Sequence, residues 1–140
     1  MLTSWLTLVA TLLLSSCERD WHVAIAGFDG DNPEFCVSRS AECTGSGVQL
    51  TLMDIDEVDD HGNRLSVAWS IQAHSNEQQD YIIRRVVYGS VPKGWLQYQQ
   101  PAPLHEESYY SINGEFYFRA VGRRIPHVYT REEFFKRHAP

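Results

Sequence analysis

At its centre the chain reads Leu65-Ser66-Val67-Ala68-Trp69-Ser70-Ile71-Gln72, the most regular alternation of apolar with small or polar residues in its 140 positions. Successive side chains of a β-strand point to opposite faces of a sheet, so a period of two predicts a strand. One face of this strand would carry Leu65, Val67, Trp69 and Ile71. The stretch therefore predicts an all-β fold with Trp69 in its core.

Further β-rich segments lie on both sides of this stretch, at 21–28, 35–37, 48–53, 81–88 and 108–121. The turn dipeptide Asn113-Gly114 divides the last of them. The acidic segment 54–63 predicts a hairpin turn, and the glycines and prolines of 89–103 predict a loop. About seven short strands at this spacing favour an immunoglobulin-like or fibronectin type III-like β-sandwich, with a small β-barrel as the alternative.

The segment from Pro103-Leu104 to Tyr110-Ser111-Ile112 resembles the tyrosine corner of such sandwiches. In that corner a tyrosine hydroxyl hydrogen-bonds back to the chain and holds a crossing between the two sheets. Tyr110 is the residue expected to do so here.

The C-terminal segment 127–137 fits two structures. Residues 130–133, Thr-Arg-Glu-Glu, have the form of a capping box that opens a short helix. The apolar residues on either side equally suit a closing strand. We favour the strand.

The N-terminal segment resembles the export signal of a bacterial lipoprotein. An uncharged apolar stretch that starts at Trp5 ends in Leu14-Ser15-Ser16-Cys17, the pattern of a cleaved signal peptide followed by a lipobox cysteine. This stretch is shorter than the roughly 17–25 apolar residues of a membrane-spanning helix. An ordinary cleaved signal and a buried N-terminal helix are the alternatives.

We therefore expect a signal peptide at 1–16, a lipidated N-terminus with a short tether at 17–20, and a single β-sandwich domain at 21–140. The lipid on Cys17 would attach the protein to a membrane and place it in the periplasm. The residue after Cys17 is Glu18. In enterobacterial lipoproteins, retention in the inner membrane is associated with an aspartate at this position. This difference favours the outer membrane over the inner membrane.

The other two cysteines, Cys36 and Cys43, form a pair once Cys17 is assigned to the lipid. Because the periplasm is oxidising, we expect a disulfide between them. Its loop of eight residues corresponds to about 2.5 kcal/mol of stabilisation. Metal ligation is the alternative, but no histidine or second cysteine pair stands near them at zinc spacing.

The charge balance is mildly acidic, with 18 Asp and Glu against 12 Lys and Arg. No basic block or stripe occurs, so nucleic acid is not an expected partner. The chain also has no Gly-x-Ser-x-Gly, no glycine-rich phosphate loop and no His-Glu-x-x-His. Its six histidines are dispersed. We expect no enzymatic activity, no cofactor and no metal site.

The acidic run 54–60 is the strongest candidate for a cation site, because carboxylate oxygens bind calcium. Its spacing does not match an EF-hand loop, and a solvated hairpin accounts for it better. Asp56, Asp59 and Asp60 could also form an acidic face that attracts a basic protein partner.

Three aromatic residues, Tyr88, Trp95 and Tyr98, flank or lie within the Pro/Gly-rich segment 89–103. Exposed aromatic residues are enriched at protein-binding hot spots, so these three are candidates for partner contact. Packing of the segment onto the sandwich is the alternative.

Several short motifs together resemble a family of small enterobacterial lipoproteins that act as type VI secretion immunity proteins. The matching motifs are Leu14-Ser15-Ser16-Cys17, Phe35-Cys36-Val37, the strand with Trp69, Tyr88-Gly89 with Pro92 and Gly94, and the stretch from Leu104 to Ile112. The resemblance implies a periplasmic protein that neutralises a secreted toxin by binding it. A structural or assembly lipoprotein of the envelope is the second hypothesis, and an enzyme whose site forms only in three dimensions is the third.

Overall fold

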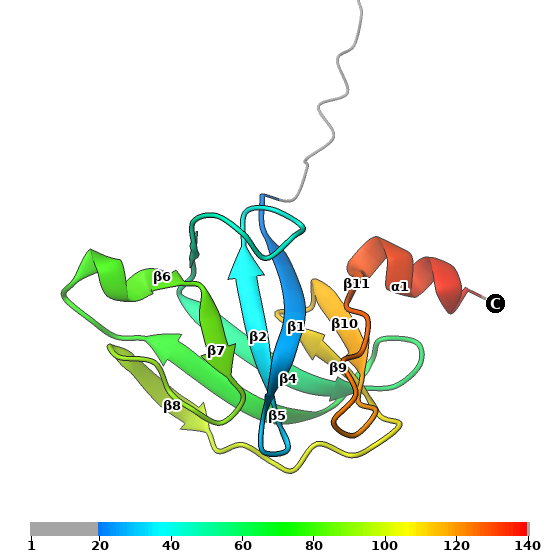
Figure 1. Cartoon of the computed structure of the whole chain (residues 1–140). Helices are drawn as coiled ribbons and strands as arrows, with labels where there is room; N and C mark the ends of the chain where they lie inside the picture. Colours follow the sequence, from blue (N-terminus) through cyan, green and yellow to red (C-terminus); the bar gives the residue numbers. More distant parts are fainter. Residues whose placement is uncertain (1–19, 140) are drawn as a thin grey trace, which may run out of the picture.

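The computed structural model describes residues 20–139, so the predicted signal peptide and Cys17 lie outside the described residues. Eleven strands, one α-helix and one 3₁₀ turn form in this part of the chain (Figure 1). They are β1 (His22–Asp29), β2 (Asn32–Ser38), β3 (Val48–Gln49), β4 (Leu52–Val58), β5 (Arg64–Ala73), η1 (Gln78–Tyr81), β6 (Ile82–Ile83), β7 (Arg85–Val87), β8 (Trp95–Gln99), β9 (Tyr109–Ile112), β10 (Phe116–Arg119), β11 (Tyr129–Thr130) and α1 (Arg131–Arg137).

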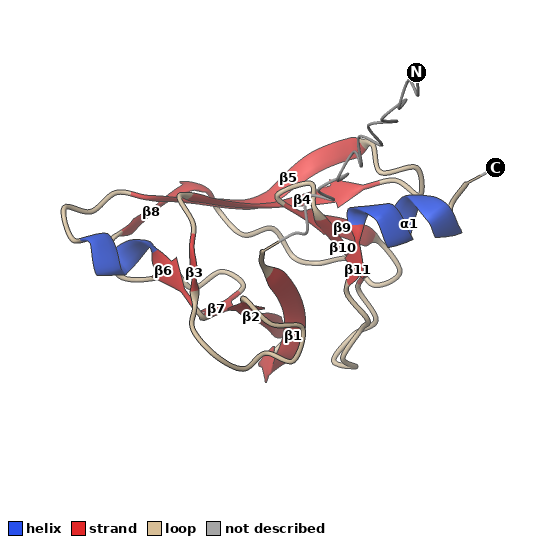
Figure 2. Ribbon diagram, turned by 90° about the horizontal axis from the view of Figure 1, so that it is seen from above, coloured by secondary structure: helices blue, strands red, loops and turns tan. Residues whose placement is uncertain are grey.

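Two antiparallel sheets face each other as separate layers (Figure 2). One has the order β1-β2-β7 and the other the order β11-β10-β9-β4-β5-β8, while β3 pairs only with β6. In immunoglobulin-like domains, strand F lies between G and C, and strand B lies beside E. Here β9 takes the place of strand F, between β10 in the place of G and β4 in the place of C. Likewise β2 takes the place of strand B, beside β7 in the place of E. This arrangement confirms the predicted all-β sandwich, and the six-stranded sheet stays open where the barrel alternative requires closure.

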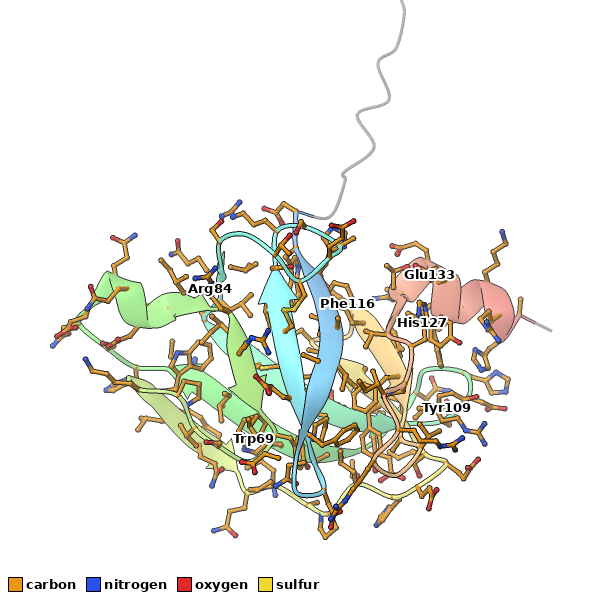
Figure 3. All side chains as sticks on the ribbon, in the orientation of Figure 1. Trp69, Arg84, Tyr109, Phe116, His127 and Glu133 are labelled. Atoms are coloured by element: carbon orange, nitrogen blue, oxygen red, sulfur yellow. A yellow bond between two sulfur atoms is a disulfide. The ribbon has the colours of Figure 1, made fainter. Side chains whose placement is uncertain are left out.

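Large apolar side chains fill the space between the two sheets. Phe35 of β2 lies 5.8 Å from Phe118 of β10 between ring centroids, and both rings are buried. Trp69 of β5 is fully buried, with its ring centroid 5.4 Å from that of Tyr88 (Figure 3). Trp69 thus lies in the core, as its place in the central stretch predicts.

The alternation in that stretch does not hold along its whole length. Trp69 pairs with Ile55 and Val67 pairs with Asp56, so Ala68 has no partner on β4. The pairing skips Leu65 in the same way. Each skipped residue reverses which face the following side chains occupy. The prediction of one shared face is therefore wrong for Val67 and Leu65, and the Leu65 side chain is 62% exposed.

Tyr110 forms the predicted bond back to the chain. The backbone N–H of His105 donates to the Tyr110 hydroxyl at 2.7 Å, and the Tyr110 side chain is fully buried. Burial raises the pKa of this phenol above its ordinary value, so the hydroxyl stays neutral. The contact joins the chain before β9 to the core, as in a tyrosine corner.

The predicted disulfide and the predicted β9–β10 turn both form. Cys36 of β2 and Cys43 are bonded, with their Cα atoms 5.9 Å apart. Asn113 and Gly114 have φ angles of 53° and 65°, the left-handed conformation that this dipeptide adopts readily in hairpin turns.

The segment 127–137 is mainly a helix, so our preference for a strand is wrong. Only Tyr129–Thr130 pairs as β11, and α1 begins directly after it. The Thr130 hydroxyl accepts a hydrogen bond from the Glu133 N–H at 3.3 Å, as a capping box does. Phe134 anchors the helix by stacking on Tyr117 of β10, with ring centroids 4.3 Å apart. No helix in residues 20–139 has the length and apolar character needed to span a membrane.

Candidate functional site

The structure separates the three aromatic candidates. The Tyr98 side chain is 63% exposed, whereas Tyr88 and Trp95 are 2% and 5% exposed. The Tyr88 hydroxyl lies 3.0 Å from the carbonyl oxygen of Ala68, and the Trp95 indole N–H donates to the carbonyl oxygen of Asp80 at 2.7 Å. The prediction of surface contact is wrong for Tyr88 and Trp95, because their polar ends find backbone partners within the fold.

Tyr98 belongs to β8, a strand that the sequence predicts as loop. Pro92, Gly94 and Pro101 surround it, but residues 95–99 contain neither glycine nor proline. β8 pairs with β5 on one side and ends the six-stranded sheet on the other. The pairing with β5 skips Tyr98. An uncharged edge strand thus presents Tyr98 and the 46% exposed Leu96 to solvent.

The other long edges of the two sheets are modified in ways that disfavour further pairing. β1 has a register shift at Ala26 and ends in Asp29, while β7 has three residues and carries Arg85; β8 also has a register shift, at Tyr98. β11 is two residues long and continues into α1. Edge strands offer unpaired N–H and C=O groups to other chains unless they are blocked in such ways. Among the described edges of these two sheets, β8 alone has more than two residues and no charged side chain, so we regard it as the edge best suited to pair with another protein.

Asp56 lies in β4 on the outer face of the large sheet and is 6% exposed. Its Oδ2 forms an ion pair with the Arg64 Nε at 3.2 Å, while its Oδ1 makes no hydrogen bond to any described residue. Burial, opposed by Arg64, raises the pKa of this carboxyl above its ordinary value. The prediction of an exposed acidic face is wrong at Asp56, because β4 continues to Val58 and takes Asp56 into the sheet.

Asp59 and Asp60 lie in the β4–β5 turn. Asp59 Oδ1 accepts hydrogen bonds from the backbone N–H groups of His61 and Asn63 at 2.9 and 2.8 Å. These bonds, together with one from the Asn63 side-chain amide, lower the pKa of the Asp59 carboxyl. Asp60 is exposed and lies 3.6 Å from the His61 Nε2. Among residues 20–139, no three His, Cys, Asp or Glu side chains are grouped to hold a metal ion. Asp59 accordingly shapes the turn.

A cleft of about 570 Å³ opens at one end of the sandwich. Its walls are the β1–β2 turn, the proline-rich segment 101–106 and the segment 120–126. The floor is apolar, with Ile25, Phe28, Leu104 and Phe118 among its residues. The cleft therefore combines a hydrophobic floor with three loops, the common composition of a binding site.

Two carboxylates, those of Asp31 and Glu106, lie among the residues that line the cleft, and no lysine or arginine does. Asp31 is joined to Arg123 by an Nε–Oδ1 contact of 2.8 Å, which links two walls of the cleft. Glu106 has no hydrogen bond or ion pair within the described part of the chain. Its Oε1 lies beside Gly122, 3.6 Å from where a side chain at that position would begin. The lining thus carries negative charge beside an apolar floor.

Sequence reasoning missed this cleft and the β8 edge. The β1–β2 turn lies about 70 to 90 positions from the other two walls of the cleft, and no local pattern reports such a meeting. One signal was present, the three prolines within 101–126 that line it. Comparison of the chain with protein-family models, with curated proteins and with solved structures gives no match.

Proposed function

We propose that the protein is a lipid-anchored periplasmic immunity protein that neutralises a type VI secretion effector by binding it. Two sequence features support the proposal: the lipobox Leu14-Ser15-Ser16-Cys17 and the resemblance to immunity lipoproteins. The observation that carries the binding role is the free, uncharged edge of β8 with Tyr98 63% exposed.

β8 suits a protein partner for two physical reasons. An extended segment of the partner that pairs with the edge gains backbone hydrogen bonds, and side-chain contacts add specificity. Tyr98 and Leu96 provide apolar area beside that edge, and Leu52 lies on the same face because Leu52 and Leu96 both pair with Gln72. Tyrosine is among the residues that contribute most at interfaces.

The proposed anchor would hold the protein close to a membrane. Cys17 lies five residues before His22, where β1 begins, and five extended residues span at most about 18 Å. The cleft lies beside the β1–β2 turn, at the other end of β1. Eight strand residues cover about 26 Å, so the cleft would face away from the membrane.

The binding role is tested by a pull-down of the effectors encoded beside the gene, with the mature chain as bait. Tyr98→Ser is expected to weaken effector binding at least about tenfold, or 1.4 kcal/mol. Leu65→Ser is the matched control, because Leu65 is 62% exposed but lies far along β5 from its pairing with β8. Equal losses in the two variants would contradict the assignment of β8.

The immunity role and the anchor have separate tests. A strain that lacks the gene should become sensitive to attack by sibling cells, and unchanged sensitivity together with no captured effector would refute immunity and favour the envelope-assembly hypothesis. Cys17→Ala should release the protein from membranes, and unchanged membrane association would refute lipidation.

A further inference from the structure

We propose that the cleft at the end of the sandwich binds an arginine side chain of the protein partner. This inference rests on the proposed function, since the arginine belongs to the bound effector. It adds a second contact to the β8 edge and defines its chemistry as a cation on an apolar stem.

The floor of the cleft suits the stem of such a side chain. Phe28, Leu104 and Phe118 line it together with Pro103, and Phe118 is almost fully buried. The methylene groups of arginine pack along apolar surfaces while the guanidinium stays near polar groups. A wholly polar ligand would leave this floor without a partner, and a wholly apolar ligand would bury the two carboxylates.

The carboxylates suit the guanidinium. Glu106 has no ionic partner among the described residues, and Asp31 lies on a different wall, the β1–β2 turn. A guanidinium presents several N–H donors in one plane and makes paired bonds to carboxylates, which an ammonium group does not. Arginine therefore fits these two acceptors better than lysine does.

Arg123, which is not among the residues that line the cleft, already places a guanidinium on Asp31. Arg123 pairs with Asp31 at 2.8 Å, and the two side chains are 71% and 86% exposed. An ion pair this exposed contributes little to stability, so an incoming arginine can replace Arg123 at little cost.

The long-range field also favours a cationic partner. Residues 1–118 contain sixteen Asp and Glu but six Lys and Arg, whereas residues 119–140 contain two and six. Asp31 and Glu106 belong to the acidic part, the wall 120–126 belongs to the basic part, and the whole chain has a net charge of −6. Such a field speeds association with a positively charged segment.

The test is an NMR titration of the mature Cys17→Ala chain with N-acetyl-arginine methylamide, with the citrulline analogue as the uncharged isostere. We expect the arginine compound to shift the backbone amide signals of Glu106 and Gly122, and the citrulline compound to shift them at least about threefold less. Glu106→Gln should weaken arginine binding about threefold to tenfold. Glu107→Gln is the matched control, because Glu107 pairs with Arg119 and does not line the cleft.

Three results would overturn the inference: no shift at roughly 50 mM compound, where even a Kd near 10 mM gives high occupancy, an equal response to citrulline, or equal losses in the two glutamate variants. Effector capture that Glu106→Gln and Asp31→Asn leave unchanged would also overturn it, while the proposed function stands. Arginine binding without capture of any effector would instead refute the proposed function and leave the cleft as a guanidinium site.

Discussion

Replacing Phe134 by alanine tests whether α1 is a docked part of the fold. Phe134 is the one fully buried side chain of α1. Its ring stacks on Tyr117 at 4.3 Å and meets Tyr109 edge-on at 5.6 Å, both between centroids. A helix of seven residues is not stable alone, since isolated helices below about 12–15 residues are marginal in water. The docking of α1 therefore depends on this side chain.

The expected loss follows from the buried area. A buried phenylalanine removes at least about 150 Å² from water, which at about 25 cal/mol per Å² corresponds to about 4 kcal/mol. Measured Phe→Ala substitutions in cores cost about 3–5 kcal/mol. With a urea m-value of about 2 kcal/mol/M, the unfolding midpoint should fall by about 2 M.

The assay combines urea unfolding, followed by tryptophan fluorescence, with limited trypsin digestion. Trp21, Trp69 and Trp95 report on the sandwich, whereas trypsin reports on α1 through Arg131, Lys136 and Arg137. If α1 detaches before the sandwich unfolds, Phe134→Ala accelerates cleavage within α1 while tryptophan fluorescence still reports a folded core.

Phe135→Ala is the matched control. Phe135 is adjacent to Phe134 but 37% exposed, so the same arithmetic gives a smaller loss, of at most about 2.5 kcal/mol. A loss below about 1 kcal/mol in Phe134→Ala, with unchanged trypsin resistance, would refute the view that Phe134 holds α1 on the sheet.

Two further predictions concern the disulfide and the buried carboxylate. Reduction of the Cys36–Cys43 disulfide, or its removal by Cys36→Ser with Cys43→Ser, should lower the free energy of unfolding by about 2.5 kcal/mol. Urea unfolding with and without reductant measures this loss, and an unchanged unfolding midpoint would contradict the prediction. Asp56 has a folded-state pKa above its ordinary value of 3.8, so the folded state binds this proton more tightly than the unfolded state does. Its contribution to stability is therefore greatest below pH 3.8 and falls as pH rises through the folded-state pKa. Asp56→Asn should remove this pH-dependent contribution. If the urea midpoints of the wild type and the variant decline equally as pH rises from 3.8, Asp56 does not make it.

Local patterns in the sequence are sufficient for several features. The Asn113-Gly114 turn depends on the conformations that these two residues adopt readily, and the structure has both at positive φ. The bond from the His105 N–H to the Tyr110 hydroxyl joins residues five positions apart. Cys36 and Cys43 are separated by seven positions, so few other arrangements of this pair compete.

Other features depend on which segment packs beside a residue. The segment 130–133 contains a capping box, but whether a helix follows depended on Tyr117 and Tyr109 offering a surface for Phe134. Trp95 is buried because its indole reaches the carbonyl oxygen of Asp80 in η1. Nothing in the sequence around Trp95 distinguishes it from the exposed Tyr98.

The Asn113-Gly114 turn, the disulfide pair and the tyrosine corner follow from the sequence, because each depends on residues close together in the chain. Three features are visible only in the folded chain: Ala68 and Leu65 interrupt the pairing of β5, β8 ends its sheet, and Asp31 and Glu106 line one cleft. These outcomes depend on contacts between distant segments. Their energies arise from the packing of whole sheets, which a pattern within one segment does not contain.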